Sequence, residues 1–550
     1  MDRRLRLTQL VIGVLCVGLV LSLFSFGLVG GGQTQDRPAP SAEPTSQPPR
    51  KVDQGMRMPG TPARSLDSLE LLDLPGARNP DRQTSYRGKG GSITFPEALP
   101  DLRAYAEQPI DWQPCGDILC ATVLAPLDWD EPGKAAVTLA VTKVPSADPK
   151  QDPLFVNPGG PGAGGTEFAA QFPADHWPGH DIVGWDPRGT GHSTHVVCGS
   201  TEQTDAFTTM DHSPDDAKED RELRARSEAF ARQCRDGSGE LLDHLTTVDV
   251  VRDMDLLRHV LGGDKLHFVG VSYGTFLGAM YATLFPDTSG RLVLDGAVEI
   301  TDAEPVSQLV GFERAFTAWA DWCASQEACV LHGKSSEALR TEISDWLAGL
   351  DTSPLTTGNR TLTQTNAALG IAFLLYGDSA VYRTLAEVIR DAMRGDGAPL
   401  LAAADEMTGR RKDGYDTLAF AFPAMGCVDS PDEGVAATKR RAEREARKAP
   451  TLGRHMGWDY TCETWAVDPL PPYKLDAKDA DPILVVGATG DPATPYEQAE
   501  RMAKQLRPAR LLTLEGPGHG AVTGSNECIA KAVGRYLSDG TLPDEGTRCT

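Results

Sequence analysis

The chain has 550 residues, of which 40% are hydrophobic and 24% charged, a composition typical of a folded globular protein. Its formal net charge of −24 argues against a nucleic-acid partner, because phosphate binding requires concentrated Lys and Arg. We interpret the acidity as a source of solubility.

The N-terminus has the pattern of an export signal. Arg3, Arg4 and Arg6 precede an uncharged apolar run at 10–29. A run of about 20 residues spans a bilayer as one helix, so an uncleaved anchor and a cleaved signal within 1–32 both stay open. Arginines at the start predict a cytoplasmic N-terminus and an external body. We therefore expect a protein that is secreted or held by residues 10–29 at the outer face of the cytoplasmic membrane.

Cysteine usage agrees with export. Apart from Cys16, ten cysteines remain, and an even number in an exported chain predicts disulfides. Sequence neighbours are the hypothesised partners: Cys115 with Cys120, Cys198 with Cys234, Cys323 with Cys329, Cys427 with Cys462, and Cys528 with Cys549. No Cys-x-x-Cys pair with nearby His and no dinucleotide fingerprint is present, so we expect neither a metal nor a cofactor.

Residues 33–90 are expected to form a linker, because the first half is rich in Pro, Ser, Thr, Gln and Gly. Short apolar runs then alternate with helical patterns over 91–296. The expected strands are 136–144, 154–157, 181–186, 265–271 and 291–294. One helix is expected around Val250 to Leu261 with Asp249 as its N-cap, and another at 275–284. This alternation predicts an α/β fold with a mostly parallel sheet and helices on both faces.

Between 297 and 480 the pattern becomes mainly helical, for example at 312–322 and 367–393. Strands return at 483–487 and 511–514, within a C-terminal part of the core at 481–550. A helical insertion of this kind is expected to form a cap over the carboxyl ends of the strands, where active sites of open α/β sheets lie.

The strongest motif is Gly270-Val271-Ser272-Tyr273-Gly274, which matches G-x-S-x-G. An apolar strand precedes it and a helix follows it, as a nucleophile elbow requires. The turn is so sharp that bulky residues at the glycine positions would clash with the backbone. Ser272 is therefore the expected nucleophile.

A serine hydroxyl needs a base within hydrogen-bond reach, and the base needs an orienting acid. In the α/β-hydrolase fold the chain order is Ser, acid, His. Asp491 follows strand 483–487, and His519 follows strand 511–514 among glycines. We assign them as acid and base, with Asp295 and Asp481 as rival acids.

The sequence Asn157-Pro158-Gly159-Gly160-Pro161-Gly162 follows an early strand, where an oxyanion loop belongs. Two backbone N–H groups can hold the negative oxygen of a tetrahedral intermediate. We assign those of Tyr273 and Gly160, with Gly159 as the alternative. Proline has no N–H and can only shape the loop.

These motifs resemble the proline iminopeptidase and tripeptidyl aminopeptidase branch of the α/β-hydrolases. The segment Asp186-Pro187-Arg188-Gly189-Thr190-Gly191-His192-Ser193 also fits that branch, and we interpret Arg188 as a structural ion-pair residue. The likeness covers about residues 95–545 and is closest to exported actinobacterial enzymes of the tripeptidyl type. Asn157 is a departure, since proline iminopeptidases usually have His there.

The resemblance implies an exopeptidase that removes short peptides or single residues from a free N-terminus. Recognition of an ammonium calls for a carboxylate in a partly buried pocket. The candidates are Glu299, Asp302, Glu304 and Asp429. Two alternatives stay open: an esterase or lipase that uses the same triad, and a non-catalytic binding protein on the same fold. The sequence does not fix the oligomeric state.

Overall fold

The computed structural model describes residues 45–74, 91–174, 177, 179–301, 305–430, 434–456 and 459–550. A single mixed sheet runs through the molecule in the order β1-β2-β3-β4-β6-β5-β7-β8-β13-β14-β15. Its strands are β1 (Thr45–Gln47), β2 (Ile110–Cys115), β3 (Ile118–Pro126), β4 (Ala136–Val144), β5 (Leu154–Asn157), β6 (Ile182–Trp185), β7 (Leu266–Val271), β8 (Ser289–Asp295), β13 (Ile483–Gly490), β14 (Ala509–Pro517) and β15 (Arg548–Cys549).

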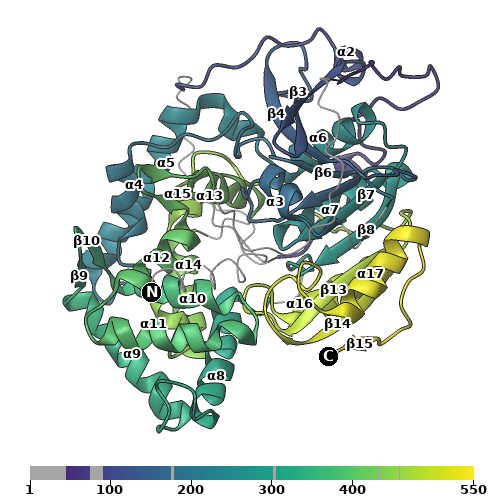
Figure 1. Ribbon diagram of the computed structural model, residues 1–550. Helices are drawn as coiled ribbons and strands as arrows, with labels where there is room; N and C mark the ends of the chain where they lie inside the picture. The colour runs from purple at the N-terminus through teal and green to yellow at the C-terminus, as the bar shows by residue number, and fades with distance from the viewer. Residues whose placement is uncertain are drawn as a thin grey trace.

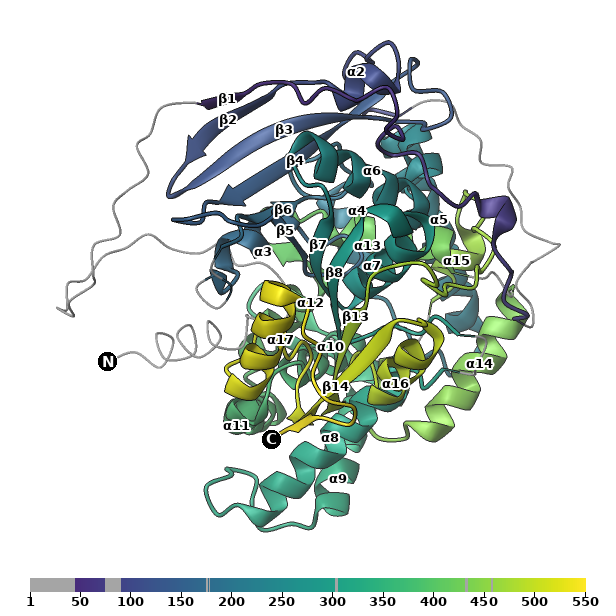
Figure 2. The same ribbon diagram turned by 90° about the vertical axis from the view of Figure 1, so that its right-hand side faces the viewer.

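The strands from β6 to β15 in this order run parallel, and β1 to β4 form an antiparallel extension at one edge. Figure 2 shows this extension at one end of the sheet and β13 and β14 towards the other. The expected mostly parallel sheet of an α/β-hydrolase is confirmed. Every strand expected from the sequence is present, with ends that differ by a few residues.

Alternate residues of the central strands divide between two apolar cores, because successive side chains of a strand point to opposite faces. Phe155, Phe268 and Leu294 belong to the core under the larger set of helices, whereas Val156 and Val269 belong to the core under the other. The helices around the sheet are α2 (Leu102–Ala106), α3 (Gly165–Gln171), α6 (Thr247–Val260), α7 (Tyr273–Leu284), α16 (Tyr496–Gln505) and α17 (Glu527–Asp539). Both faces of the parallel strands are thus covered.

Helix α6 begins before the expected N-cap. Thr246 is the N-cap, and its hydroxyl accepts a hydrogen bond from the backbone N–H of Asp249 at 3.2 Å. The carboxylate of Asp249 accepts the N–H of Thr246 at 3.3 Å in return. The expectation that Asp249 is the N-cap is wrong, because this reciprocal capping box places Asp249 at the third helical position.

A helical cap is inserted between β8 and β13 and has a core of its own. Figure 1 shows α8 to α12 gathered beside the sheet rather than on either face of it. The helices of this insertion are α8 (Gln308–Ser325), α9 (Ser336–Thr352), α10 (Gln364–Leu375), α11 (Tyr382–Met393), α12 (Ala398–Thr408), α13 (Leu418–Asp429), α14 (Val435–Lys448) and α15 (Thr461–Thr464). It also holds two small hairpins, β9 (Leu355–Thr357) with β10 (Arg360–Leu362), and β11 (Arg410–Arg411) with β12 (Gly414–Tyr415).

Two features of this region were not expected from the sequence. The helical pattern at 367–393 is divided between α10 and α11 by a break at Tyr376 to Asp378. A second helical excursion, α4 (Thr201–Thr208) and α5 (Ala217–Ser238), leaves the core between β6 and α6 and contacts α15 of the cap.

All five expected disulfides are present: Cys115–Cys120, Cys198–Cys234, Cys323–Cys329, Cys427–Cys462 and Cys528–Cys549. A chain with this many disulfides belongs outside the cytoplasm, where thiols are not kept reduced. Within the described ranges, no helix has the length and apolar character needed to cross a membrane. The apolar run at 10–29, expected to serve as signal or anchor, lies outside those ranges.

Part of the segment expected as a linker lies against the core. Strand β1 pairs with β2, and Arg50 forms an ion pair with Asp264 at 2.6 Å. Further along, the N–H of Gly60 donates to Asp255 at 3.0 Å and Arg64 pairs with Asp476 at 2.6 Å. The boundaries at 90, 296 and 480 stay predictions.

Candidate active site

Ser272 stands at the turn between β7 and α7. It has a φ of 56° and a ψ of −123°, a backbone conformation that L-residues rarely adopt. Such strain persists only where the surroundings hold it, and here the N–H of Ser272 donates to the carbonyl of Asp295 at 2.9 Å. A Cβ at Gly270 would lie 2.3 Å from the carbonyl oxygen of Gly274, so the motif needs glycine there. The elbow expected from the sequence is formed.

His519 and Asp491 meet at the same edge of the sheet, past the ends of β14 and β13. The Nδ1 atom of His519 lies 2.8 Å from Oδ2 of Asp491 and 3.0 Å from its Oδ1. Both side chains are buried, with relative exposures of 3% for His519 and 5% for Asp491. The rival acid Asp481 instead pairs with Lys265 at 3.3 Å, at the start of β13.

The imidazole lies close to the elbow. A Cβ placed on Gly296 would lie 2.9 Å from Cε1 of His519, so the ring packs directly on this glycine. Gly296 follows Asp295, whose carbonyl accepts the N–H of Ser272. The three expected catalytic residues are therefore gathered at the carboxyl ends of the adjacent strands β7, β8, β13 and β14.

The electrostatics around His519 favour its protonated form. Burial alone would lower the pKa of His519, but the charge and hydrogen bond of Asp491 outweigh it. The charge of Asp295 adds to this effect, and the net pKa is raised. An imidazole whose cation is stabilised is suited to take a proton from a serine hydroxyl.

Two contacts hold the acid and base that no sequence motif indicated. Thr494, in the turn after Asp491, donates its N–H to Oδ1 of Asp491 at 2.8 Å and has its hydroxyl 3.0 Å from Oδ2. The cap contributes the carbonyl of Tyr376, which accepts the N–H of His519 at 3.0 Å. Thr494 lies three residues after the acid, a spacing typical of turns in which an Asp side chain accepts backbone N–H groups, so this contact could have been predicted from the sequence.

The glycine-rich loop approaches the elbow at backbone contact distance. A Cβ on Gly159 would lie 2.8 Å from the amide nitrogen of Tyr273 and 2.9 Å from Cβ of Ser272. The N–H of Gly159 donates to Oδ1 of Asn157 at 2.9 Å and is therefore already engaged. Within the described part of the chain the N–H of Gly160 has no acceptor. This arrangement favours Gly160 over Gly159 as an oxyanion donor beside Tyr273.

Cap helix α13 closes over this loop. Leu418 lies 3.5 Å from a Cβ placed on Gly160, and Ala421 lies 2.6 Å from one placed on Gly162. The next residue, Phe422, keeps 52% of its surface exposed although it is large and apolar. The cap thus has an exposed apolar residue next to the segment of α13 that contacts the loop.

The four residues expected to recognise an ammonium differ in their surroundings. Both carboxylate oxygens of Glu299 are engaged, one by Thr301 and the other by an ion pair with Arg501. Asp302 and Glu304 lie outside the described residues. Asp429, at the end of α13, accepts the N–H of Thr247 at 3.1 Å and its hydroxyl at 2.6 Å. That same hydroxyl lies 2.5 Å from the phenol oxygen of Tyr273, and burial raises the pKa of Asp429 to about 7.

Two further carboxylates near the loop were missed. Glu167 stands in the first turn of α3, and Asp416 precedes α13. Each has one buried carboxylate oxygen without a hydrogen-bond partner among the described residues. Burial raises the pKa of Glu167, and the charges of Asp186 and Asp416 raise it further. Glu167 lies seven residues after Gly160, so its proximity to the loop was visible in the sequence.

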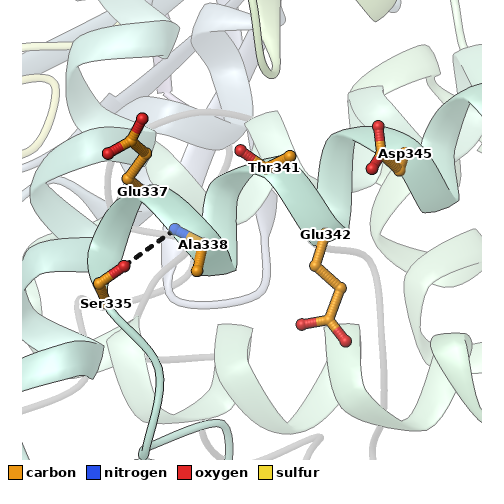
Figure 3. A pocket seen from close by; sticks show the side chains of 6 residues that line it. All are labelled: Ser335, Glu337, Ala338, Thr341, Glu342 and Asp345. Atoms are coloured by element: carbon orange, nitrogen blue, oxygen red, sulfur yellow. Dashed lines mark hydrogen bonds between the residues drawn. The ribbon is translucent and has the colours of Figure 1, made fainter.

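Other acidic groups lie apart from this site. A surface hollow on α9 is lined by Ser335, Glu337, Ala338, Thr341, Glu342 and Asp345 (Figure 3). There the Ser335 hydroxyl caps the helix at Ala338 and Glu342 pairs with Lys334. Elsewhere, carboxylate oxygens of Asp211, Glu219 and Asp351 lie within 4.8 Å of one another. Neither group contains an expected site residue.

Comparison with known proteins finds similar sequences among hydrolases. Residues 449–549 match the family model described as TAP-like protein. Serine protease Hip1 of Mycobacterium tuberculosis is 32% identical over 479 residues, which cover 80% of this chain and 91% of that protein. Tripeptidyl aminopeptidase of Streptomyces lividans is 32% identical over 80% of this chain and 86% of its own length. Carboxylesterase B of Mycobacterium tuberculosis is 36% identical over 78% and 86%, respectively.

Proposed function

Because the chain belongs to the TAP-like family of α/β-hydrolases, and is a serine hydrolase, we propose that it is an exported exopeptidase that releases short peptides from free N-termini. The observation that carries the proposal is the hydrogen-bonded pair His519–Asp491 packed beside the strained Ser272 elbow. Two of the three relatives described above are named as peptidases, which supports peptide substrates.

In the proposed mechanism Ser272 Oγ attacks the scissile carbonyl carbon while Nε2 of His519 takes the hydroxyl proton. Asp491 holds Nδ1–H and so keeps the lone pair of Nε2 available. The oxyanion is held by the N–H groups of Tyr273 and Gly160. His519 then protonates the leaving amine, and water attacks the acyl-enzyme by the reverse sequence, with His519 again as base.

The exopeptidase part of the proposal predicts dependence on a free ammonium. A tripeptide extends over about 10 Å, so a group that binds its ammonium would lie at about that distance from the scissile carbonyl. We expect a chromogenic tripeptide amide with a free N-terminus to have a kcat/KM about 100-fold higher than its N-acetylated form, since acetylation removes the charge. Steady-state kinetics on the two substrates measure this.

Equal rates on the free and acetylated tripeptides would reject exopeptidase action while leaving the hydrolase intact. Faster cleavage of short acyl esters than of any peptide amide would instead favour the esterase alternative, for which the carboxylesterase relative is the supporting observation. Absence of labelling by a fluorophosphonate probe would favour the non-catalytic alternative.

We propose Glu167 as the carboxylate that receives the ammonium, in preference to Asp429 and to Asp416, which forms an ion pair with Arg411 at 2.9 Å. The reason is that Glu167 retains a buried oxygen without a partner among the described residues, whereas both oxygens of Asp429 accept hydrogen bonds from Thr247. Glu167→Gln should raise KM for the free tripeptide about tenfold and leave the acetylated one unchanged. Asp429→Asn, which removes the same charge from α13, serves as the matched control; a larger loss in that variant would assign the ammonium to Asp429.

A further inference from the structure

Asp295 lies at the junction of the elbow and the base. It ends β8 and has a relative exposure of 1%. Its backbone carbonyl accepts the N–H of Ser272 at 2.9 Å. The imidazole of His519 packs against the residue after Asp295, Gly296. Asp295 is thus connected through its backbone to both the nucleophile and the base.

The side chain of Asp295 contacts the loop that carries His519. Its Oδ2 accepts the N–H of Val522, three residues after the histidine, at 2.7 Å. Its Oδ1 is buried and has no hydrogen-bond partner among the described residues. A buried carboxylate with an unpaired oxygen is costly, and a neutral residue could fill the same space more cheaply.

The charge of Asp295 reaches the imidazole. Four groups face His519: Asp491 and Thr494 from the turn after β13, Tyr376 from the cap, and Asp295 from β8. Burial keeps the Tyr376 phenol neutral, because it raises the pKa far above its ordinary value. Asp491 and Asp295 are therefore the two charges that favour protonation of His519.

We propose that Asp295 is a positioning residue for His519: its carboxylate fixes the 519–522 loop through Val522 and places a negative charge near the imidazole. Asp491 is hydrogen-bonded to Nδ1 of His519 directly. Asp295 instead influences His519 through the position of the 519–522 loop and through the electrostatic effect of its charge. This proposal rests on the proposed role of Ser272 and His519, and it goes beyond the triad.

The test is the pH dependence of Ser272 labelling by a fluorophosphonate probe, which needs no knowledge of the natural substrate. Asp295→Asn keeps an oxygen to accept the N–H of Val522 and removes the charge. Loss of the charge lowers the pKa of His519, so the acid limb of the rate constant should move to lower pH. The plateau rate constant should also fall about tenfold, because a weaker base removes the serine proton less effectively.

Two further variants separate charge from structure. Asp295→Ala also loses the acceptor for Val522, so its plateau should fall further while its acid limb moves in the same direction. Asp481→Asn removes one charge from the far end of the adjacent strand β13 and should leave the profile unchanged. Each plateau rate constant is divided by the fraction of protein that is folded, which near-UV circular dichroism measures.

An acid limb that stays in place in Asp295→Asn would overturn the proposal, whatever the plateau does, because a purely structural role lowers the rate at every pH alike. Failure of the unsubstituted protein to be labelled would instead reject the proposed function. The two failures are therefore distinguishable in one experiment.

Discussion

Replacement of Ser272 by Ala is expected to lower kcat/KM by about a millionfold on every substrate that the protein cleaves. The hydroxyl is the only part removed, and the oxyanion donors of Tyr273 and Gly160 and the His519–Asp491 pair stay in place. Residual activity of about 10³-fold over water would therefore persist, because binding and oxyanion stabilisation survive loss of the nucleophile. Initial rates with peptide amides and esters, together with fluorophosphonate labelling, measure the loss.

Ser289→Ala is the matched control for this substitution. Ser289 is a fully buried serine, whereas Ser272 is half-buried; Ser289 lies at the opposite end of β8 from the site, and its hydroxyl has no partner among the described residues. Its removal should leave kcat/KM within about twofold, because nothing near the site changes. A Ser272→Ala variant that kept more than about 1% of the activity would place the nucleophile elsewhere.

The parts of the site that the sequence predicted are those with a local signal. Ser272 lies in a five-residue motif whose first glycine, Gly270, is required by a contact within the turn itself, so strand, turn and helix could be predicted together. Asp491 and His519 are far from Ser272 in the chain, but each follows a strand, and parallel strands bring their carboxyl ends to one edge of the sheet. Chain order and sheet topology were therefore sufficient to predict that the three residues lie near one another.

The parts that were missed depend on contacts between distant segments. The carbonyl of Tyr376 reaches His519 only because the chain breaks between α10 and α11, whereas the apolar pattern there looked continuous. Glu167 on α3 and Asp416 in the cap are close enough for the charge of Asp416 to raise the pKa of Glu167, and neither residue belongs to a motif. Glu299 followed a strand as a binding carboxylate should, but Arg501 from α16 engages it. Such partners are set by the packing of the cap, which periodicity does not encode.

Arg188 shows the opposite case, a motif residue whose role is structural. It is fully buried, and all five of its N–H groups are used. Two donate to Asp253 on α6, at 2.8 and 2.7 Å. The others reach the backbone carbonyls of Pro126, Leu127 and His244. The side chain therefore joins β3, the loop after β6 and α6.

Arg188→Met is expected to lower the free energy of unfolding by about 3–5 kcal/mol at pH 8, because it leaves the Asp253 carboxylate buried without its partner. Burial already raises the pKa of Asp253 to about 6 against the opposing charge of Arg188. Without Arg188 the pKa rises further, so the native state takes up a proton that the unfolded state, with a pKa of about 3.9, releases. Between about pH 4 and 6 both native states hold this proton and lose stability alike, so the loss relative to the unsubstituted protein should grow as pH rises from about 6 to 8. Guanidinium unfolding under non-reducing conditions measures it at each pH.

Arg252→Met provides the comparison, since Arg252 lies one residue before Asp253 and forms only a 3.5 Å contact with Asp130, whose side chain is 83% exposed. That substitution should cost no more than about 1 kcal/mol and show no matching pH dependence. The double variant Arg188→Met/Asp253→Leu also removes the buried carboxylate of Asp253. It should regain part of the lost stability, and the loss that remains should no longer depend on pH. Recovery is incomplete because the three backbone carbonyls that Arg188 bound remain without donors. If Arg188→Met lost the same stability at pH 5 and pH 8, the cost would come from those carbonyls and from packing, and the ion pair would not be its source.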